Sequence, residues 1–126
     1  MLHKTLALAV LTLCLAACGD TEPEAGDDCE GNTGACTGPS TALLCEGGTL
    51  RSFNCRGPSG CIGNDEKISC DLTNARPGDR CRSAQENLGQ CDASNANQLL
   101  RCSEGSWRAA ACKGCAVQSG NIVCQP

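Results

Sequence analysis

The fold is decided by TALLCEGGTLRSFNC, residues 41–55. The two glycines in its middle supply the positive φ angles that a tight turn needs. The stretch therefore predicts a hairpin whose strands run over Thr41–Cys45 and Thr49–Cys55. Alternation along the first strand places Leu43 on the same face as Cys45.

The same pattern returns later in the chain, where Gln98–Cys102 and Ser106–Cys112 flank a turn ending at Gly105. The cysteines also repeat: in two sets of six, nine residues separate the third from the fourth and eight separate the fifth from the sixth. The sets are Cys29, Cys36, Cys45, Cys55, Cys61, Cys70 and Cys81, Cys91, Cys102, Cys112, Cys115, Cys124. We interpret this as an internal duplication with its boundary in residues 71–77.

A second, smaller hairpin is predicted at the end of each copy. In the first copy Cys61–Ile62 and Lys67–Cys70 flank a turn at residues 63–66, and in the second Cys115–Val117 and Asn121–Cys124 flank a three-residue turn. Apolar residues of the hairpins should form two miniature cores. The expected core residues are Leu43, Leu50, Leu100, Trp107, Ile68 and Ile122.

Cysteine is abundant and large apolar side chains are scarce. The chain has 14 cysteines but one Trp, one Phe and no Tyr, so disulfides must replace most of an apolar interior. Each bridge should contribute about 2–4 kcal/mol. We predict that pairing stays within each copy, although six cysteines can pair in many ways. The expected fold is small, disulfide-rich and mostly β, with two tandem six-cysteine hairpin modules.

The N-terminus has the features of an export signal. Basic residues precede an apolar run, and Thr5–Ala17 spans 13 residues, short of the roughly 20 that cross a bilayer. The ending Leu15-Ala16-Ala17-Cys18 resembles the lipobox of bacterial lipoproteins. That resemblance implies diacylglycerol on the Cys18 thiol, cleavage before Cys18 and acylation of the new amine. Two or three acyl chains hold a protein firmly on a membrane.

Negative charge is concentrated beside this cysteine. Residues 20–30 carry six acidic and no basic residues, whereas residues 31–126 are nearly balanced, with nine Lys or Arg and eight Asp or Glu. The acidic segment is expected to be a solvated spacer. Without a basic patch, nucleic acid is not an expected partner. The predicted organisation is signal peptide 1–17, acidic tether 18–27, repeat 28–72 and repeat 78–126.

The match between the copies extends beyond cysteine. Gly26–Cys29 aligns with Gly78–Cys81, and Cys55-Arg56-Gly57 with Cys112-Lys113-Gly114. With the lipobox, these repeats resemble the Cys-rich repeat lipoproteins of myxobacterial type, a family that implies architecture and envelope location but no activity. Gly19 rather than Asp follows Cys18, which favours the outer over the inner membrane.

Catalytic, metal and cofactor chemistry are not expected. The one histidine, His3, lies in the predicted signal peptide, so the mature chain lacks the base of Ser-His-Asp and Cys-His pairs and the histidine of the usual catalytic zinc sites. Cys112-Lys113-Gly114-Cys115 is a CxxC, but no βαβ pattern surrounds it and Ala116 stands where a c-type haem motif has histidine. We expect these cysteines to form structural disulfides to different partners, with metal binding and redox activity as the alternatives.

The function expected is that of a non-catalytic envelope or surface lipoprotein with a structural or binding role. Its partners would be the membrane, through the lipid, and a cell-wall, polysaccharide or protein partner. Two alternatives name residues. Trp107 and Arg108 would bind a sugar ring, unless Trp107 fills the core. Arg56 and Lys113, each beside a cysteine, would act as bait residues of a protease inhibitor.

Overall fold

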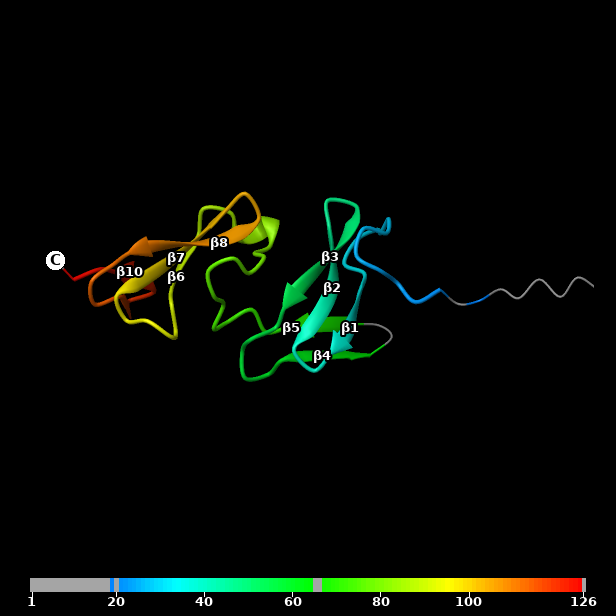
Figure 1. Cartoon of the computed structure of the whole chain (residues 1–126), viewed down its shortest axis with the longest axis horizontal. Helices are drawn as coiled ribbons and strands as arrows, with labels where there is room; N and C mark the ends of the chain where they lie inside the picture. The colour runs from blue at the N-terminus through cyan, green and yellow to red at the C-terminus, as the bar shows by residue number, and fades with distance from the viewer. Residues whose placement is uncertain (1–18, 20, 65–66, 126) are drawn as a thin grey trace, which may run out of the picture.

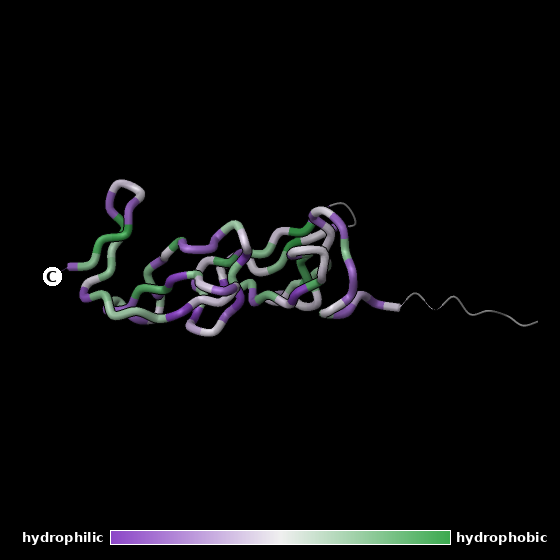
Figure 2. Tube along the Cα trace, turned by 90° about the horizontal axis from the view of Figure 1, so that it is seen from above, coloured by the Kyte–Doolittle hydropathy of each residue, from purple (hydrophilic) through white to green (hydrophobic). Residues whose placement is uncertain are grey.

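The computed structural model describes residues 19, 21–64 and 67–125, so the predicted lipidation site Cys18 lies outside the described residues. The fold is small, disulfide-rich and mostly β, as expected. The molecule is elongated, with one half toward its N-terminal end and the other toward its C-terminus (Figures 1 and 2). Apolar stretches occur in both halves (Figure 2).

The first half contains a three-stranded antiparallel sheet and a separate hairpin. Strands β1 (Gly34–Gly38), β2 (Thr41–Glu46) and β3 (Thr49–Asn54) lie in the order β1-β2-β3. Strands β4 (Cys61–Asn64) and β5 (Lys67–Cys70) form the hairpin. The two predicted hairpins are confirmed, but β4 runs two residues further than predicted. Strand β1 was not predicted, because its glycine-rich sequence lacks apolar alternation. It forms through backbone pairing with β2.

The second half has the same elements in the same order. Sheet β6-β7-β8 is followed by hairpin β9–β10, and a short 3-10 turn, η1, precedes the sheet. The bounds are η1 Ser83–Gln85, β6 Gly89–Cys91, β7 Gln98–Ser103, β8 Ser106–Ala111, β9 Ala116–Gln118 and β10 Asn121–Val123. Again the central hairpin, β7–β8, matches the prediction. The edge strand β6 was not predicted.

Two-residue turns close the central hairpins. Gly47 and Gly48 have φ of 60° and 82°, and Glu104 and Gly105 have φ of 53° and 72°. Positive φ at both central residues is what a type I′ turn requires, and this turn matches the twist of paired strands. The glycine signal in the sequence therefore located both turns correctly.

Each sheet is bordered by a loop, which we call its head loop: Glu24–Cys29 in the first half and Arg76–Cys81 in the second. The amide of Leu50 donates to the carbonyl oxygen of Asp27, and that of Trp107 donates to Asp79, both at 2.8 Å. These loops cover one end of β3 and β8. Residues 26 and 27, expected in the tether, are thus hydrogen-bonded into the first half.

Six disulfides link the twelve cysteines of residues 29–124. They are 29–45, 36–61 and 55–70 in the first half, and 81–102, 91–115 and 112–124 in the second. Both sets join first to third, second to fifth and fourth to sixth. Every bridge stays within its half, as expected, and the two CxxC cysteines have different partners.

The apolar residues form separate clusters in the two halves. Strand β2 is buried on both faces: one cluster holds Ala42, Leu44, Phe53 and Cys55 against β4–β5, and another holds Leu43, Cys45 and Leu50. The second half has one fully buried cluster, made of Ala75, Cys81, Leu100, Cys102 and Trp107. Of the expected core residues, Ile68 and Ile122 are only half-buried. Phe53 and Leu44 were missed because alternation assigned one buried face to the hairpin.

Candidate functional site

Trp107 does not form a binding surface. Its side chain is 2% exposed and packs among Leu100, Ala75 and the Cys81–Cys102 bridge. A sugar ring needs an exposed indole face for stacking, so the prediction of Trp107 as a binding residue is wrong. Its neighbour Arg108 is exposed and forms a surface ion pair with Glu104, at 2.6 Å.

The main polar cluster lies where the two halves meet, around Asp79 in the second head loop. Its carboxylate accepts hydrogen bonds from Nε and Nη2 of Arg56, at 2.6 and 3.0 Å, and from Nδ2 of Asn54, at 2.9 Å. The backbone amide of Arg76 donates a further bond of 2.8 Å. Asp79 is 6% exposed. Arg56 is therefore engaged between the halves, and the inhibitor hypothesis rests on Lys113, which is exposed.

These contacts favour the charged forms of both partners. Burial opposes ionisation of Asp79, but hydrogen bonds from Arg56, Arg76 and Asn54 outweigh it and hold the pKa of Asp79 below its ordinary value. The hydrogen bond with Asp79 raises the pKa of Arg56. The pair is thus ionised throughout the neutral range.

A second contact between the halves is formed by Glu46 at the end of β2. Its carboxylate accepts hydrogen bonds from Nε of Arg82 and from the amide and hydroxyl of Ser83, the last two at 3.1 and 2.7 Å. Burial opposes ionisation of Glu46, but the bonds from Ser83 and Arg82 lower its pKa overall. Because Glu46 and Asn54 lie at opposite ends of the β2–β3 hairpin, these two contacts fix the orientation of one half against the other.

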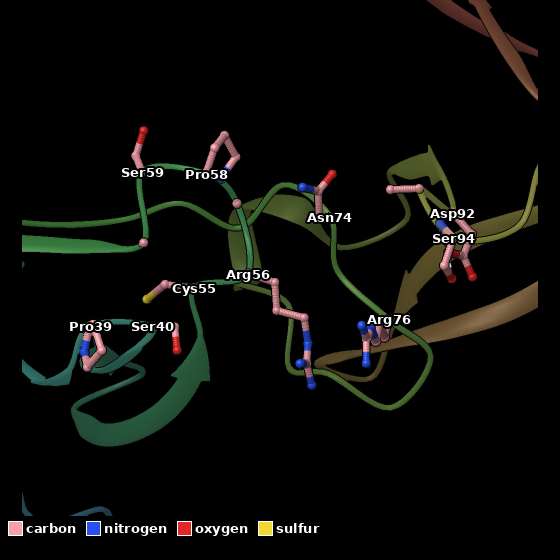
Figure 3. A pocket seen from close by; sticks show the side chains of 13 residues that line it. Pro39, Ser40, Cys55, Arg56, Pro58, Ser59, Asn74, Arg76, Asp92 and Ser94 are labelled. Atoms are coloured by element: carbon pink, nitrogen blue, oxygen red, sulfur yellow. Dashed lines mark hydrogen bonds between the residues drawn. The ribbon is translucent and has the colours of Figure 1, made fainter.

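A cleft of about 620 Å³ opens beside the Asp79 cluster. Pro39, Ser40 and Cys55–Gly60 come from the first half, and Asp92–Ser94 from the second. Figure 3 shows Cys55 on one side, Asp92 and Ser94 on the other, and Arg56 between them. The hydroxyl of Ser94 holds the pKa of Asp92 below its ordinary value.

The lining of this cleft is polar and includes the hydroxyl groups of Ser40, Ser59 and Ser94. Arg76 and Asn74, from the segment that joins the halves, add hydrogen-bonding groups. Cys55 is in a disulfide with Cys70, so no thiol faces the opening. The arrangement offers groups from both halves that can bind polar partners.

Among the described residues, one group of potential metal ligands is close enough to hold an ion: Cys81, Cys102 and Glu86. The two sulfurs are bonded to each other, and a metal site needs them as thiolates. Glu86 instead accepts a hydrogen bond from the amide of Glu104, at 2.9 Å. The group therefore supports the β7–β8 turn.

Sequence reasoning missed Asp79 as the central residue of this region. Its signal was the repeated Gly-Asp-x-Cys pattern, but Asp27 has the same signal. What distinguishes Asp79 is its contact with Arg56, 23 residues away in the chain, which only the arrangement of the halves creates.

Comparison with known proteins finds no relative: no protein family model, curated protein or solved structure matches the chain. Within residues 19, 21–64 and 67–125, no helix has the length and apolar character needed to span a membrane. Functional conclusions therefore depend on the residues of this chain alone.

Proposed function

We propose that this protein is an exported lipoprotein, anchored by lipid on Cys18, with a non-catalytic structural or binding role in the cell envelope. Its two halves would be copies of one disulfide-linked module, carried on a short acidic tether. The observation that carries the proposal is the complete pairing of the twelve cysteines in residues 29–124.

Complete pairing supports both export and lipidation. Disulfides persist in oxidising compartments outside the cytoplasm. Because those twelve cysteines pair with one another, none of them is a disulfide partner for Cys18. The Cys18 thiol is then available for alkylation by lipid. The lipobox Leu15–Cys18 supplies the signal for that modification.

The binding role rests on the cleft between the halves. It is polar and open, and ionic contacts on Asp79 and Glu46 hold its two walls in one arrangement. A preformed polar cleft suits a polysaccharide, cell-wall or peptide partner because binding then costs little ordering. Of the cations that line the cleft, Arg76 forms no salt bridge within the described part of the chain. Arg76→Ala is therefore the variant to compare with the parent in cell-wall and polysaccharide pull-down assays.

The anchoring proposal is tested by expressing the parent and a Cys18→Ala variant in bacteria supplied with labelled palmitate. We expect label and membrane association in the parent and neither in the variant. Mass measurement should show a lipid adduct on the chain that begins at Cys18. Alkylation without reductant should modify no cysteine of residues 29–124. A parent protein that keeps Met1, or whose thiols are alkylated without reduction, would overturn the proposal.

A further inference from the structure

Side chains on and next to β3 bind the second half of the molecule. Arg56 and Asn54 hold Asp79, and Glu46 holds Arg82. Arg51 lies beside this contact, in a pocket that both halves line. We call Glu46, Arg51, Asn54 and Arg56 the β3 surface. It binds a head loop that follows it in the chain.

The second half repeats this surface along β8. The equivalent residues, the β8 surface, are Ser103, Arg108, Ala111 and Lys113. Arg108, Ala111 and Lys113 are exposed, and among the described residues no acidic group pairs with Lys113. Strand β8 ends at the extremity of the elongated molecule that is remote from its N-terminal segment (Figure 1). One binding surface in the chain is thus occupied by the second half. On its counterpart Lys113 has no acidic partner among the described residues, and Arg108 forms only the surface ion pair with Glu104.

The first head loop is the matching unoccupied element. Asp27 accepts a bond from the amide of Glu24 at 2.8 Å, just as Asp79 accepts one from Arg76 at 2.8 Å. Asp27 is exposed and has no salt bridge with any other residue that the structure describes, whereas Asp79 is bound to Arg56. The two loops therefore present a carboxylate in the same local geometry.

The charge differences between the two loops match those between the two surfaces. Glu30 directly follows the first head loop where Arg82 follows the second, and Ser103 stands where the β3 surface has Glu46. A contact between the first head loop and the β8 surface thus avoids opposing two carboxylates. The loop supplies negative charge and the surface supplies the cations Arg108 and Lys113, which is the complementarity that selects partners.

We propose that the head loop of one chain binds the β8 surface of a second copy, with Asp27 against Lys113 and Asp28 against Arg108. The contact is head-to-tail, so it extends to rows of molecules. Asp27 lies nine residues from Cys18, so molecules in such a row lie along one membrane surface. The inference uses the head loop and β8 and does not depend on the lipid, which only raises the local concentration.

The test is carbodiimide cross-linking of the purified protein on lipid vesicles, since this reagent couples a lysine amine to a contacting carboxylate. The lysines after Cys18 are Lys67 and Lys113. We expect a cross-linked dimer in which peptide mapping joins Lys113 to Asp27 or Asp28. Lys113→Arg keeps the charge but should lose the cross-link, and the matched control Lys67→Arg should keep it.

Charge reversal provides the second arm. Lys113→Glu should abolish the dimer, and the double variant Asp27→Lys/Lys113→Glu should restore it. The inference is overturned by the absence of a cross-linked dimer, by a dimer that survives Lys113→Arg, or by a double variant that stays monomeric while its six disulfides are intact. Failure of the anchoring proposal is recognised separately, because the protein would not float with the vesicles.

Discussion

The two halves share a disulfide connectivity but place their aromatic side chains on opposite faces of equivalent sheets. Phe53, on β3, packs on the face covered by hairpin β4–β5. Trp107, on β8, packs on the other face, with Leu100 and Ala75. Trp107 corresponds to Leu50, three residues before Phe53, and strand residues an odd number apart point to opposite faces.

The difference shows that the disulfides maintain the strand order, whereas the buried apolar side chains can lie on either face of the sheet. The counterpart of Phe53 is Ala110 and that of Leu44 is Arg101, and both counterparts are exposed. The second half nevertheless keeps the strand order and connectivity of the first. Covalent links between the same strand positions therefore specify the fold more strongly than any one apolar cluster does.

The largest expected change in stability comes from removing the two aromatic side chains. Phe53→Ala and Trp107→Ala should each lower the free energy of unfolding by about 3–5 kcal/mol, because each empties a fully buried site. Urea unfolding followed by circular dichroism measures the loss. Ser52→Ala, an exposed change on the same strand as Phe53, is the control. A Phe53→Ala loss no larger than that of the control would mean that this core contributes nothing.

Removal of equivalent bridges should have the next largest effect, and should be similar in the two halves. The Cys55–Cys70 and Cys112–Cys124 bridges span 15 and 12 residues, and loss of either should cost about 3 kcal/mol through the loop entropy of the unfolded chain. Paired Cys→Ala variants compared by thermal unfolding provide the measurement. Strongly unequal losses would contradict the view that both halves depend on the framework alike.

The contrast between the two head loops predicts a smaller, asymmetric effect. Asp79→Ala leaves Arg56 without its buried partner and should cost about 1.5–3 kcal/mol, the range for hydrogen bonds to charged groups. Asp27→Ala removes the equivalent carboxylate, which is exposed and caps Glu24, and should cost much less. Urea unfolding of dilute protein compares them. Equal losses would show that Asp79 acts only within its own loop.

The smallest expected effect is a dependence on acid. Asp79 and Glu46 have pKa values below the ordinary 3.8 and 4.5, so they bind fewer protons when folded than when unfolded. Their stabilisation is complete above those ordinary values and is lost as pH falls through the lowered values. Stability between pH 6 and 2 should decline less in Asp79→Asn/Glu46→Gln than in the parent. An unchanged decline would exclude these carboxylates as its cause.

The local structure was largely predictable from the sequence. The glycine pairs located the turns, and the cysteine spacing indicated two equal sets that pair internally. Strands β1 and β6 were not predictable, because glycine-rich segments such as Gly34–Gly38 carry no alternation and form strands through pairing with a neighbour. Cys18 remains a prediction from its motif.

By itself, the sequence determined where the central hairpins turn and that the cysteines pair within two sets, because turn geometry and cysteine spacing act over short distances. Which cysteine pairs with which came from the tertiary structure. Only the tertiary structure decided which carboxylate joins the halves and which aromatic residue is hidden. Asp27 and Asp79 lie in the same local sequence pattern, and the sequence left open whether Trp107 is buried in the core or exposed on the surface. Their roles differ because burial and ion pairing depend on what the rest of the folded chain places beside them.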